Sequence, residues 1–403
     1  MGNALEFYDF TTYAYFAVQI GHTFFSNHSP GVGLLLSLAT FGAGFALRPL
    51  GAILIGRFSD RVGRRPAMLF SFALMGVAIF GLALTPSYIS IGPLAPILVV
   101  MWRMCQGFAL GGEVGPTTAF LVESAPANRR GLYGAWQGGS QNIAAMAGGL
   151  VGVSLTALAG PAALESWGWR AAFLLGALIL PFGLLLRRSL PETLSHAEAP
   201  PKVGDSLLRH TRVLFLGLGL VASATISTYI FGFMTTYAIT TLHMPAGVSL
   251  GATVVNGASG LCGGLLGGWL SDRYGRRMLM LAPRVIFLIA IWPAFTLMVR
   301  NHDAASLLGC TGFMSFFSAL TTASVLVSIT ESLSGEVRGL GMGAVYATAV
   351  AVFGGTTQPI IQLLIQTTHD PLSPAWYMIG ATVIGLLASI FVRETAPARI
   401  LTR

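Results

Sequence analysis

A ten-residue pattern that occurs twice constrains the fold of this chain more than any other feature. Residues 56–65 read GRFSDRVGRR and residues 268–277 read GWLSDRYGRR, so both follow G-x-x-x-D-R-x-G-R-R. Each copy lies between two long apolar runs. A short, strongly charged segment in that position is expected to be a turn that joins two membrane helices. The chain is therefore expected to be a duplicated membrane protein.

A second repeat supports the duplication. Glu123 and Arg130 in the first half correspond to Glu331 and Arg338 in the second, at an offset of roughly two hundred and ten residues, as in the first repeat. We predict an all-α membrane protein with twelve transmembrane helices in two bundles. The N-terminal six-helix bundle is expected at residues 1–187, a cytoplasmic linker at 188–210 and the C-terminal six-helix bundle at 211–403.

The composition agrees with a membrane protein. Hydrophobic residues make up 54% of the chain and charged residues 9%, against roughly 25% in soluble domains. The net charge of +8 does not indicate nucleic-acid binding, because the basic residues fall in alternate loops and at the C-terminus. By the positive-inside rule these loops are cytoplasmic, which predicts a multi-pass protein of the bacterial inner membrane with both termini inside. The chain begins almost inside its first helix, so we expect the native N-terminus to lie further upstream.

The apolar runs give the expected helices, since about twenty residues span a bilayer. The expected ranges are 3–25, 31–56, 67–86, 93–121, 131–157, 168–187, 211–237, 246–270, 278–299, 305–329, 338–366 and 374–393.

Arg103 is the first candidate for a substrate contact. It lies about nine residues into the fourth expected helix, roughly 14 Å deep at 1.5 Å per residue. A charge at that depth costs at least about 2.5 kcal/mol and needs a reason. Gln106 and Glu113 follow on the same helical stripe. The alternative is that Arg103 forms a permanent ion pair with an acid from another helix.

Acidic residues at membrane depth occur only in the first half. Glu6 and Asp9 are three residues apart, with Tyr13 one turn later, so all three can face the same cavity. Neighbouring carboxyl groups in a partly dry space do not both ionise easily, which suits proton uptake and release. We therefore predict proton coupling by Asp9, Glu6 or Glu113. The alternative is that the first two pair with Arg48 or cap helix ends.

Arg48 is the second candidate anion contact, or else part of a gate below the site. The second half supplies neutral hydrogen-bonding groups in place of deep charges, an asymmetry that suits an anion with several oxygens. The predicted substrate-binding residues are Arg103, Arg48, Tyr13, Gln137, Gln141, Asn142, Tyr229, Asn256, Ser318 and Tyr346. For any single hydroxyl, helix packing is the stronger explanation.

The repeated loops are expected to act as a cytoplasmic gate, with ion pairs that form in one state and break in the other. Exposed pairs contribute only about 0 to 1 kcal/mol each, so a network is needed. The predicted gate residues are Asp60, Arg61, Arg64, Arg65, Glu123 and Arg130, with Asp272, Arg273, Arg276, Arg277, Glu331 and Arg338.

These motifs resemble the major facilitator superfamily of secondary transporters. Residues 2–10, GNALEFYDF, and residues 103–107, RMCQG, resemble its metabolite:proton symporter family. Within that family the chain is most similar to bacterial citrate/proton symporters and their tricarballylate relatives. The stretches that carry this likeness are 45–51, 91–96, 166–170, 186–190, 353–356 and 373–376. The resemblance implies uptake of a tricarboxylate together with protons, with Arg48 and Arg103 at the positions of the family's membrane arginines.

The sequence thus predicts a symporter that carries citrate or a related tricarboxylate by alternating access and functions as a monomer in the lipid bilayer. Its expected partners are a small organic anion and protons, with no nucleic acid. One alternative is a symporter for 2-oxoglutarate, shikimate or betaine/proline, and another is a drug/proton antiporter, which the two arginines argue against. No metal spacing, phosphate loop or nucleophile triad indicates an enzyme, and no cofactor is expected.

Overall fold

The computed structural model describes residues 2–62, 64–111, 121–122, 124–126, 128–177, 210–334 and 338–396, without the side chains of residues 2–6, 56, 59–61, 64, 65, 68 and 339. Within these ranges the regular elements are all helical. The remaining residues include Glu113, Glu123 and nearly all of the expected linker 188–210, so those predictions lie outside the described part of the chain.

The first half contains the helices α1 to α9. They are α1 (Gly2–Tyr15), α2 (Ala17–Phe24), α3 (Pro30–Ala46), α4 (Arg48–Val62), α5 (Arg64–Leu84), the short α6 (Tyr88–Ile91), α7 (Leu94–Leu110) and α9 (Arg130–Ala163), followed by the π-helix η1 (Leu164–Gly168). Residues 169–177 continue as helix.

The second half repeats this plan. Its elements are α12 (Thr211–Thr240), α13 (Ala246–Tyr274), α14 (Arg276–Asn301), α15 (Ala304–Ser332), α16 (Arg338–Ala349), the π-helix η2 (Val350–Gly354), α17 (Gly355–Thr368) and α18 (Ser373–Phe391).

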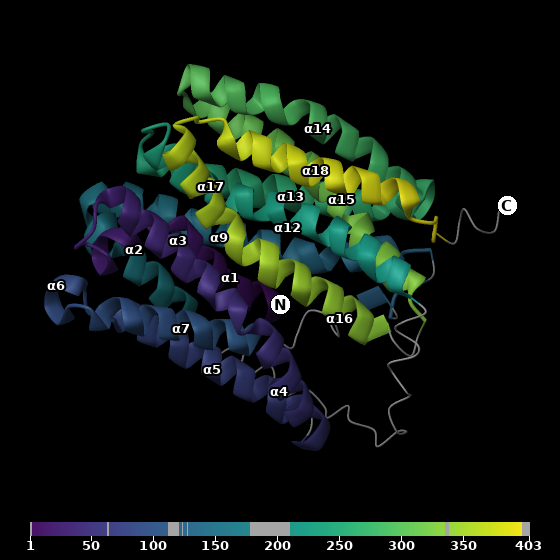
Figure 1. Ribbon diagram of the computed structural model, residues 1–403, viewed down its shortest axis with the longest axis horizontal. Helices are drawn as coiled ribbons and strands as arrows, with labels where there is room; N and C mark the ends of the chain where they lie inside the picture. Colours follow the sequence, from purple (N-terminus) through teal and green to yellow (C-terminus); the bar gives the residue numbers. More distant parts are fainter. Residues whose placement is uncertain are drawn as a thin grey trace.

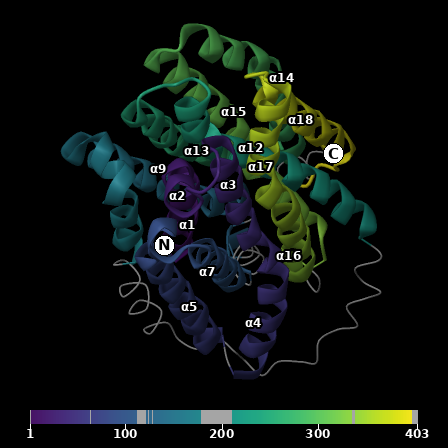
Figure 2. The ribbon, with the colours of Figure 1, turned by 60° about the vertical axis from the view of Figure 1, so that its left-hand side comes forward.

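Eight stretches of the described chain are long and apolar enough to cross a membrane, and two shorter apolar helices accompany them. Figure 1 shows the helices running in broadly one direction, with α4, α5 and α7 on one side and α14 and α18 on the other. The view in Figure 2 also separates these two groups. The expected multi-helix membrane fold is confirmed, while the bundle and linker boundaries stay predictions.

Three of the expected spans are broken or distorted. The first breaks at Phe16, between α1 and α2, and the second breaks at Leu47, between α3 and α4. Pro49 explains the second break, because proline lacks the backbone N–H and disfavours helical geometry in the residue before it. The eleventh contains η2, and π-helical turns occur often at functional sites. Periodicity alone predicts none of these breaks.

Glycines set the closest contacts between the halves. On α9 and α13, Gly131 lies against Gly268, and Gly257 lies against the backbone of Asn142. A Cβ atom at either glycine of α13 would overlap the neighbouring helix. Gly42 of α3 approaches Gly355 of α17 in the same way. These small residues allow the two halves to meet along two helix pairs.

A second pair of glycines positions Arg103 within the first half. Gly44 of α3 and Gly107 of α7 pack so closely that a Cβ atom at Gly107 would overlap the Gly44 carbonyl. The Arg103 backbone carbonyl lies beside Gly44. Arg103 is thereby placed beside Phe41, which lies one turn before Gly44 on α3.

Candidate functional site

A cavity lies between the two halves of the molecule. Its walls come from α1, α3 and α9 of the first half and from α12, α13, α15, α16, η2 and α17 of the second. Its polar lining consists of Thr11, Tyr15, Gln137, Gln141, Asn142, Thr225, Thr228, Tyr229, Asn256, Ser315, Ser318, Thr322, Tyr346 and Gln358. Within the part of the chain that the structure describes, no ionisable acid, lysine or arginine lines it.

Most of the predicted substrate-binding residues line this cavity. They are Gln137, Gln141, Asn142, Tyr229, Asn256, Ser318 and Tyr346. The structure thus brings amides of α9 together with polar groups from four elements of the second half, although their role in binding stays a prediction.

Some polar groups of the wall already bond one another. The Ser315 hydroxyl donates to Asn256 Oδ1 over 2.7 Å, which leaves the Asn256 amide nitrogen as the group that can donate. Gln358 Nε2 donates to the backbone carbonyl of Tyr229 over 3.2 Å. Gln141 Nε2 is buried and has no hydrogen-bond partner in the described structure. The wall can therefore offer donors to a ligand with many oxygens.

Arg48, Arg103, Tyr13 and Asp9 lie behind this wall rather than on it. Arg103 and Tyr13 are 0% exposed and Arg48 is 6% exposed. None of the four is among the described residues that line the cavity, which corrects the expectation that Asp9 and Tyr13 face it. The reason is packing between helices: Phe10 and Phe41 stand between the cavity and the arginines.

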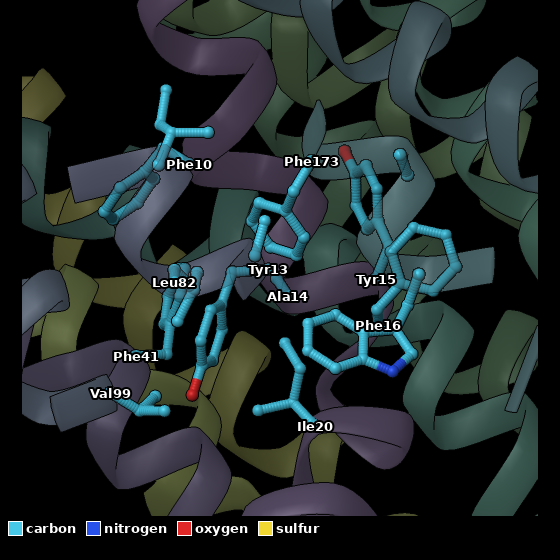
Figure 3. Close-up of a cluster of buried hydrophobic side chains, with 14 of the residues drawn as sticks. Phe10, Tyr13, Ala14, Tyr15, Phe16, Ile20, Phe41, Leu82, Val99 and Phe173 are labelled. Atoms are coloured by element: carbon cyan, nitrogen blue, oxygen red, sulfur yellow. The ribbon is translucent and has the colours of Figure 1, made fainter. Parts of the chain in front are cut away.

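Aromatic rings surround both guanidinium groups. The Phe10 ring lies 4.6 Å from the Cζ atom of Arg48 and 4.6 Å from that of Arg103. Phe45 covers Arg48 at 4.3 Å, while Tyr13 and Phe41 lie 4.4 and 5.2 Å from Arg103. Figure 3 shows Phe10, Tyr13 and Phe41 in one buried cluster. A cation–π contact contributes about 0.5 to 1 kcal/mol at an exposed site and about 2 kcal/mol or more when it is desolvated.

The buried arginines keep unused hydrogen-bond donors. Arg103 Nη1 donates to Gln106 Oε1 one turn along α7. The Nε and Nη2 atoms of both Arg48 and Arg103, and Nε2 of Gln106, have no hydrogen-bond partner among the described residues. Buried unpaired donors are rare in native proteins, so five of them in one cluster indicate a place where an acceptor binds.

Asp9 lies in the same buried layer. It is 1% exposed, and neither carboxyl oxygen has a hydrogen-bond partner in the described structure. Arg103 interacts with it electrostatically, but the described residues form no ion pair between the two. The alternative of a permanent Arg103 ion pair therefore finds no partner among these residues. The side chain of Glu6 and all of Glu113 lie outside the described structure.

The second copy of the repeated loop contacts the first half through Asp272. We call the region around Gly131, Asp272 and Glu331 the charged end of the molecule. Asp272 accepts hydrogen bonds from the backbone N–H groups of Gly131 (2.8 Å) and Leu132 (3.0 Å), at the start of α9. Arg276 pairs with Asp272 at 2.8 Å and with Glu331 at 3.3 Å. A carboxylate at a helix N-terminus is stabilised by the unpaired N–H groups there.

The other predicted gate residues that the structure describes have different kinds of contact. Arg273 stacks on Trp269 at 4.1 Å, and Arg338 donates from Nε to the Thr330 carbonyl over 2.9 Å. Arg277 donates to the Ile390 carbonyl over 2.8 Å, and Arg130 stands at the first residue of α9. The first copy cannot be compared, because the side chains of Asp60, Arg61, Arg64 and Arg65, and all of Glu123, lie outside the described structure.

Sequence reasoning missed two parts of these clusters. One is the aromatic cover of the arginines, although the i, i+4 spacing of Phe41 and Phe45 was a visible signal. The other is the segment after α18: Glu394 accepts from the backbone N–H groups of Arg276 and Arg277, and Thr395 donates to Glu331 over 2.7 Å. Glu394 gave no signal, because this contact depends on the packing of α18 against α14.

Known proteins resemble the chain over almost its whole length. The profile described as Major Facilitator Superfamily matches residues 1–281 and 247–402. A citrate-proton symporter of Klebsiella pneumoniae is 38% identical, covering 98% of this chain and 91% of that protein. The alpha-ketoglutarate permease of Escherichia coli (strain K12) is 32% identical, with 98% and 92% covered.

A solved structure shares the fold. The xylose transporter XylE from E. coli, in an inward open conformation, superposes with a TM-score of 0.77 at 17% identity, covering 99% of this chain and 97% of that one. The sequence matches and this fold agree with the two repeated motifs and the multiple apolar helices. The chain therefore belongs to the Major Facilitator Superfamily, in the branch that includes these citrate-proton and alpha-ketoglutarate carriers.

Proposed function

We propose that this protein is a proton-coupled symporter that takes up citrate or a related tricarboxylate by alternating access. The citrate-proton symporters at 35% and 38% identity over nearly the full chain support this assignment. The protein would work as a monomer in the bacterial inner membrane, with both termini in the cytoplasm.

The buried arginines are the observation that carries the proposal. Arg48 and Arg103 supply four unpaired guanidinium donors, and Gln106 adds an amide donor. Carboxylates satisfy such donors best, because charge-assisted hydrogen bonds are roughly twice as strong as neutral ones. Asn256, Gln141 and Tyr229 line the adjacent cavity and would bind the remaining oxygens of the ligand. A tricarboxylate has enough acceptors to engage both sets.

Asp9 is the proposed coupling group in this scheme. Among the described residues its buried carboxyl group has no hydrogen-bond partner, and Arg103 is the charged side chain that stabilises its ionised form. When a carboxylate of the ligand binds Arg103, it screens the positive charge that stabilises ionised Asp9. Proton uptake by Asp9 then becomes favourable, so ligand and proton bind together. Glu6 and Glu113 remain the alternative coupling residues.

The charged end would supply the gate. Asp272 bridges the halves by holding the start of α9, while Arg276, which also pairs with Glu331, holds Asp272 in place from the second half. Rocking of the halves would break the bonds to Gly131 and Leu132 but keep the pairs with Arg276. One state is thus favoured by a few hydrogen bonds that can be broken reversibly.

Uptake of labelled citrate into proteoliposomes tests the proposal. We expect an inward proton gradient to stimulate uptake, and unlabelled tricarballylate to compete more strongly than 2-oxoglutarate, shikimate or betaine. Citrate uptake at the same rate with and without the proton gradient would contradict proton coupling. Uptake of 2-oxoglutarate, shikimate or betaine in place of citrate would contradict the assignment of a tricarboxylate substrate.

A further inference from the structure

One aromatic ring separates the cavity from both buried arginines. Phe10 and Phe41 line the cavity, whereas Arg48 and Arg103 do not line it within the described structure. The Phe10 ring contacts both guanidinium groups at 4.6 Å. A ligand in the cavity therefore meets phenyl faces before it meets the unpaired guanidinium donors.

The aromatic cover is completed from the other half of the molecule. Tyr229 of α12 packs edge-on against Phe45 at 5.3 Å and against Phe41 at 5.9 Å. Phe10 packs against Phe41 and Phe45, each at 4.8 Å. We call these four residues, Phe10, Phe41, Phe45 and Tyr229, the aromatic shutter. Since they come from both halves, relative motion of the halves changes their contacts.

The backbone around the shutter contains several points where a helix can bend. The helix that carries Phe10 ends at Tyr15, and the helix that carries Phe41 and Phe45 ends at Ala46. On the facing side, the π-helix η2 ends at Gly354, which packs on the rings of Phe45 and Tyr229. Discontinuous membrane helices next to a binding site are typical of transporters that change conformation.

We propose that the aromatic shutter is closed in this structure and must open before a polycarboxylate reaches Arg48 and Arg103. This inference rests on the proposed function and adds the regulation of its site. Carboxylates replace the cation–π contacts with charge-assisted hydrogen bonds, which are the stronger interaction for a guanidinium. The shutter therefore opens for an anion and stays closed over the arginines without one. Phe10 and Tyr229 act here as positioning residues.

The rate at which phenylglyoxal modifies individual arginines tests this proposal directly. Purified full-length protein is treated with the reagent, and adducts at Arg48, Arg103 and Arg284 are quantified by peptide mass spectrometry. Arg284 is an internal control, because it is equally buried but donates to Gly385 and Ser389, away from the shutter. We expect Phe10→Ala to speed modification of Arg103 about tenfold, the factor expected if a cation–π contact of typical strength is lost, and to leave Arg284 unchanged.

Variants of Tyr229 and a distant phenylalanine provide matched tests. Tyr229→Ala should speed modification of Arg48 several times more than Tyr229→Phe, because Tyr229→Phe removes only the hydroxyl that interacts with Arg48 and keeps the ring of the shutter. Phe295→Ala removes an equally buried phenyl group from the second half and should leave Arg48 and Arg103 at their original rates. Size-exclusion profiles identify any variant that does not fold. If Phe10→Ala does not fold, the comparison of Tyr229→Ala with Tyr229→Phe tests the shutter.

The outcomes separate this inference from the proposed function. Unchanged Arg103 and Arg48 rates in folded Phe10→Ala and Tyr229→Ala protein would overturn the shutter. Citrate should slow the modification of Arg103 in Phe10→Ala, and its failure to do so would overturn the role of the shutter in guarding a citrate site. If citrate uptake fails in the original protein while Phe10→Ala still exposes Arg103, the shutter stands and the substrate assignment fails.

Discussion

The two halves of the molecule share a scaffold but not its buried charges. The offset of the first repeat relates Arg103 on α7 to Ser315 on α15, and the slightly shorter offset of the second repeat relates it to Thr311 on the same helix, so neither corresponding residue is charged. Where the first half places a guanidinium among aromatic rings, the second places a hydroxyl that bonds Asn256. At this position the charge is therefore found in the first half only, while the second half buries Arg284 elsewhere, on α14, where it donates to Gly385 and Ser389.

This difference separates two tasks. The first half holds a costly set of buried charges: Arg48 and Arg103, whose unpaired donors suit an anion, and Asp9, whose carboxyl group suits a proton. The second half offers neutral groups that bond one another without a ligand, such as Ser315 and Asn256. We expect selectivity for charge to come from the first half, and fine placement of the ligand from the second.

The largest expected effect is that of Arg103→Ala, which removes the central charge of the first half. Breaking a buried, hydrogen-bonded charge contact costs about 2 to 5 kcal/mol, so citrate uptake should fall at least about 30-fold. Initial uptake rates normalised to protein in the membrane measure this. Arg103→Lys keeps the charge but not the planar fork and should be intermediate. Normal citrate uptake by Arg103→Ala would contradict the assignment of Arg103 to the substrate-binding site.

Asp9→Asn should separate binding from coupling. Without a titratable carboxyl group the proton gradient should no longer drive uptake, while exchange of labelled for unlabelled citrate across the membrane continues. The comparison of gradient-driven uptake with exchange checks this expectation. Glu6→Gln and Glu113→Gln are the matched variants: whichever of the three substitutions alone abolishes the gradient effect identifies the coupling acid.

Asn256→Ala should have a smaller effect, because it removes a neutral hydrogen bond from the second half. Such a bond contributes about 1 kcal/mol, which corresponds to a rise in KM of about fivefold with little change in the maximal rate. Kinetics of citrate uptake at several concentrations provide the measurement. A loss as large as that of Arg103→Ala would contradict the division of tasks between the halves.

Asp272→Ala should have the smallest effect on citrate binding. Its main effect should be to weaken the contact between the halves at the charged end. Asp272→Ala removes the bonds to Gly131 and Leu132 and also the ion pair with buried Arg276, so it is expected to lower stability by more than the loss of an ordinary helix cap, which costs about 1 to 2 kcal/mol. Thermal unfolding of the purified protein measures it. Asp303→Ala is the matched control, since Asp303 caps α15 within one half by accepting from Ser306 N–H. Equal effects of both variants on transport would argue against a bridging role for Asp272.

The sequence alone determined the class of fold and the kinds of group at the site. Apolar runs of about twenty residues allow few structures other than membrane helices, and a charge inside such a run, as at Arg103, stands out because of its cost. The repeated motif also identified Asp272 and Arg276 as gate candidates, because a sequence repeat can be recognised without knowledge of tertiary contacts. Polar residues within apolar helices also marked Gln141 and Asn256 as candidate binding groups.

Only the tertiary structure decided which of these groups face the cavity. Helical periodicity tells which residues share a stripe, but it does not tell against which other helix that stripe packs. The close approach of α3 to α7 at Gly44 and Gly107 brings Phe41 and Phe45 to the arginines, and Phe10 of α1 completes the cover. Arg48 and Arg103 therefore lie behind a wall of aromatic rings, because contacts between helices distant in sequence set the direction of each stripe.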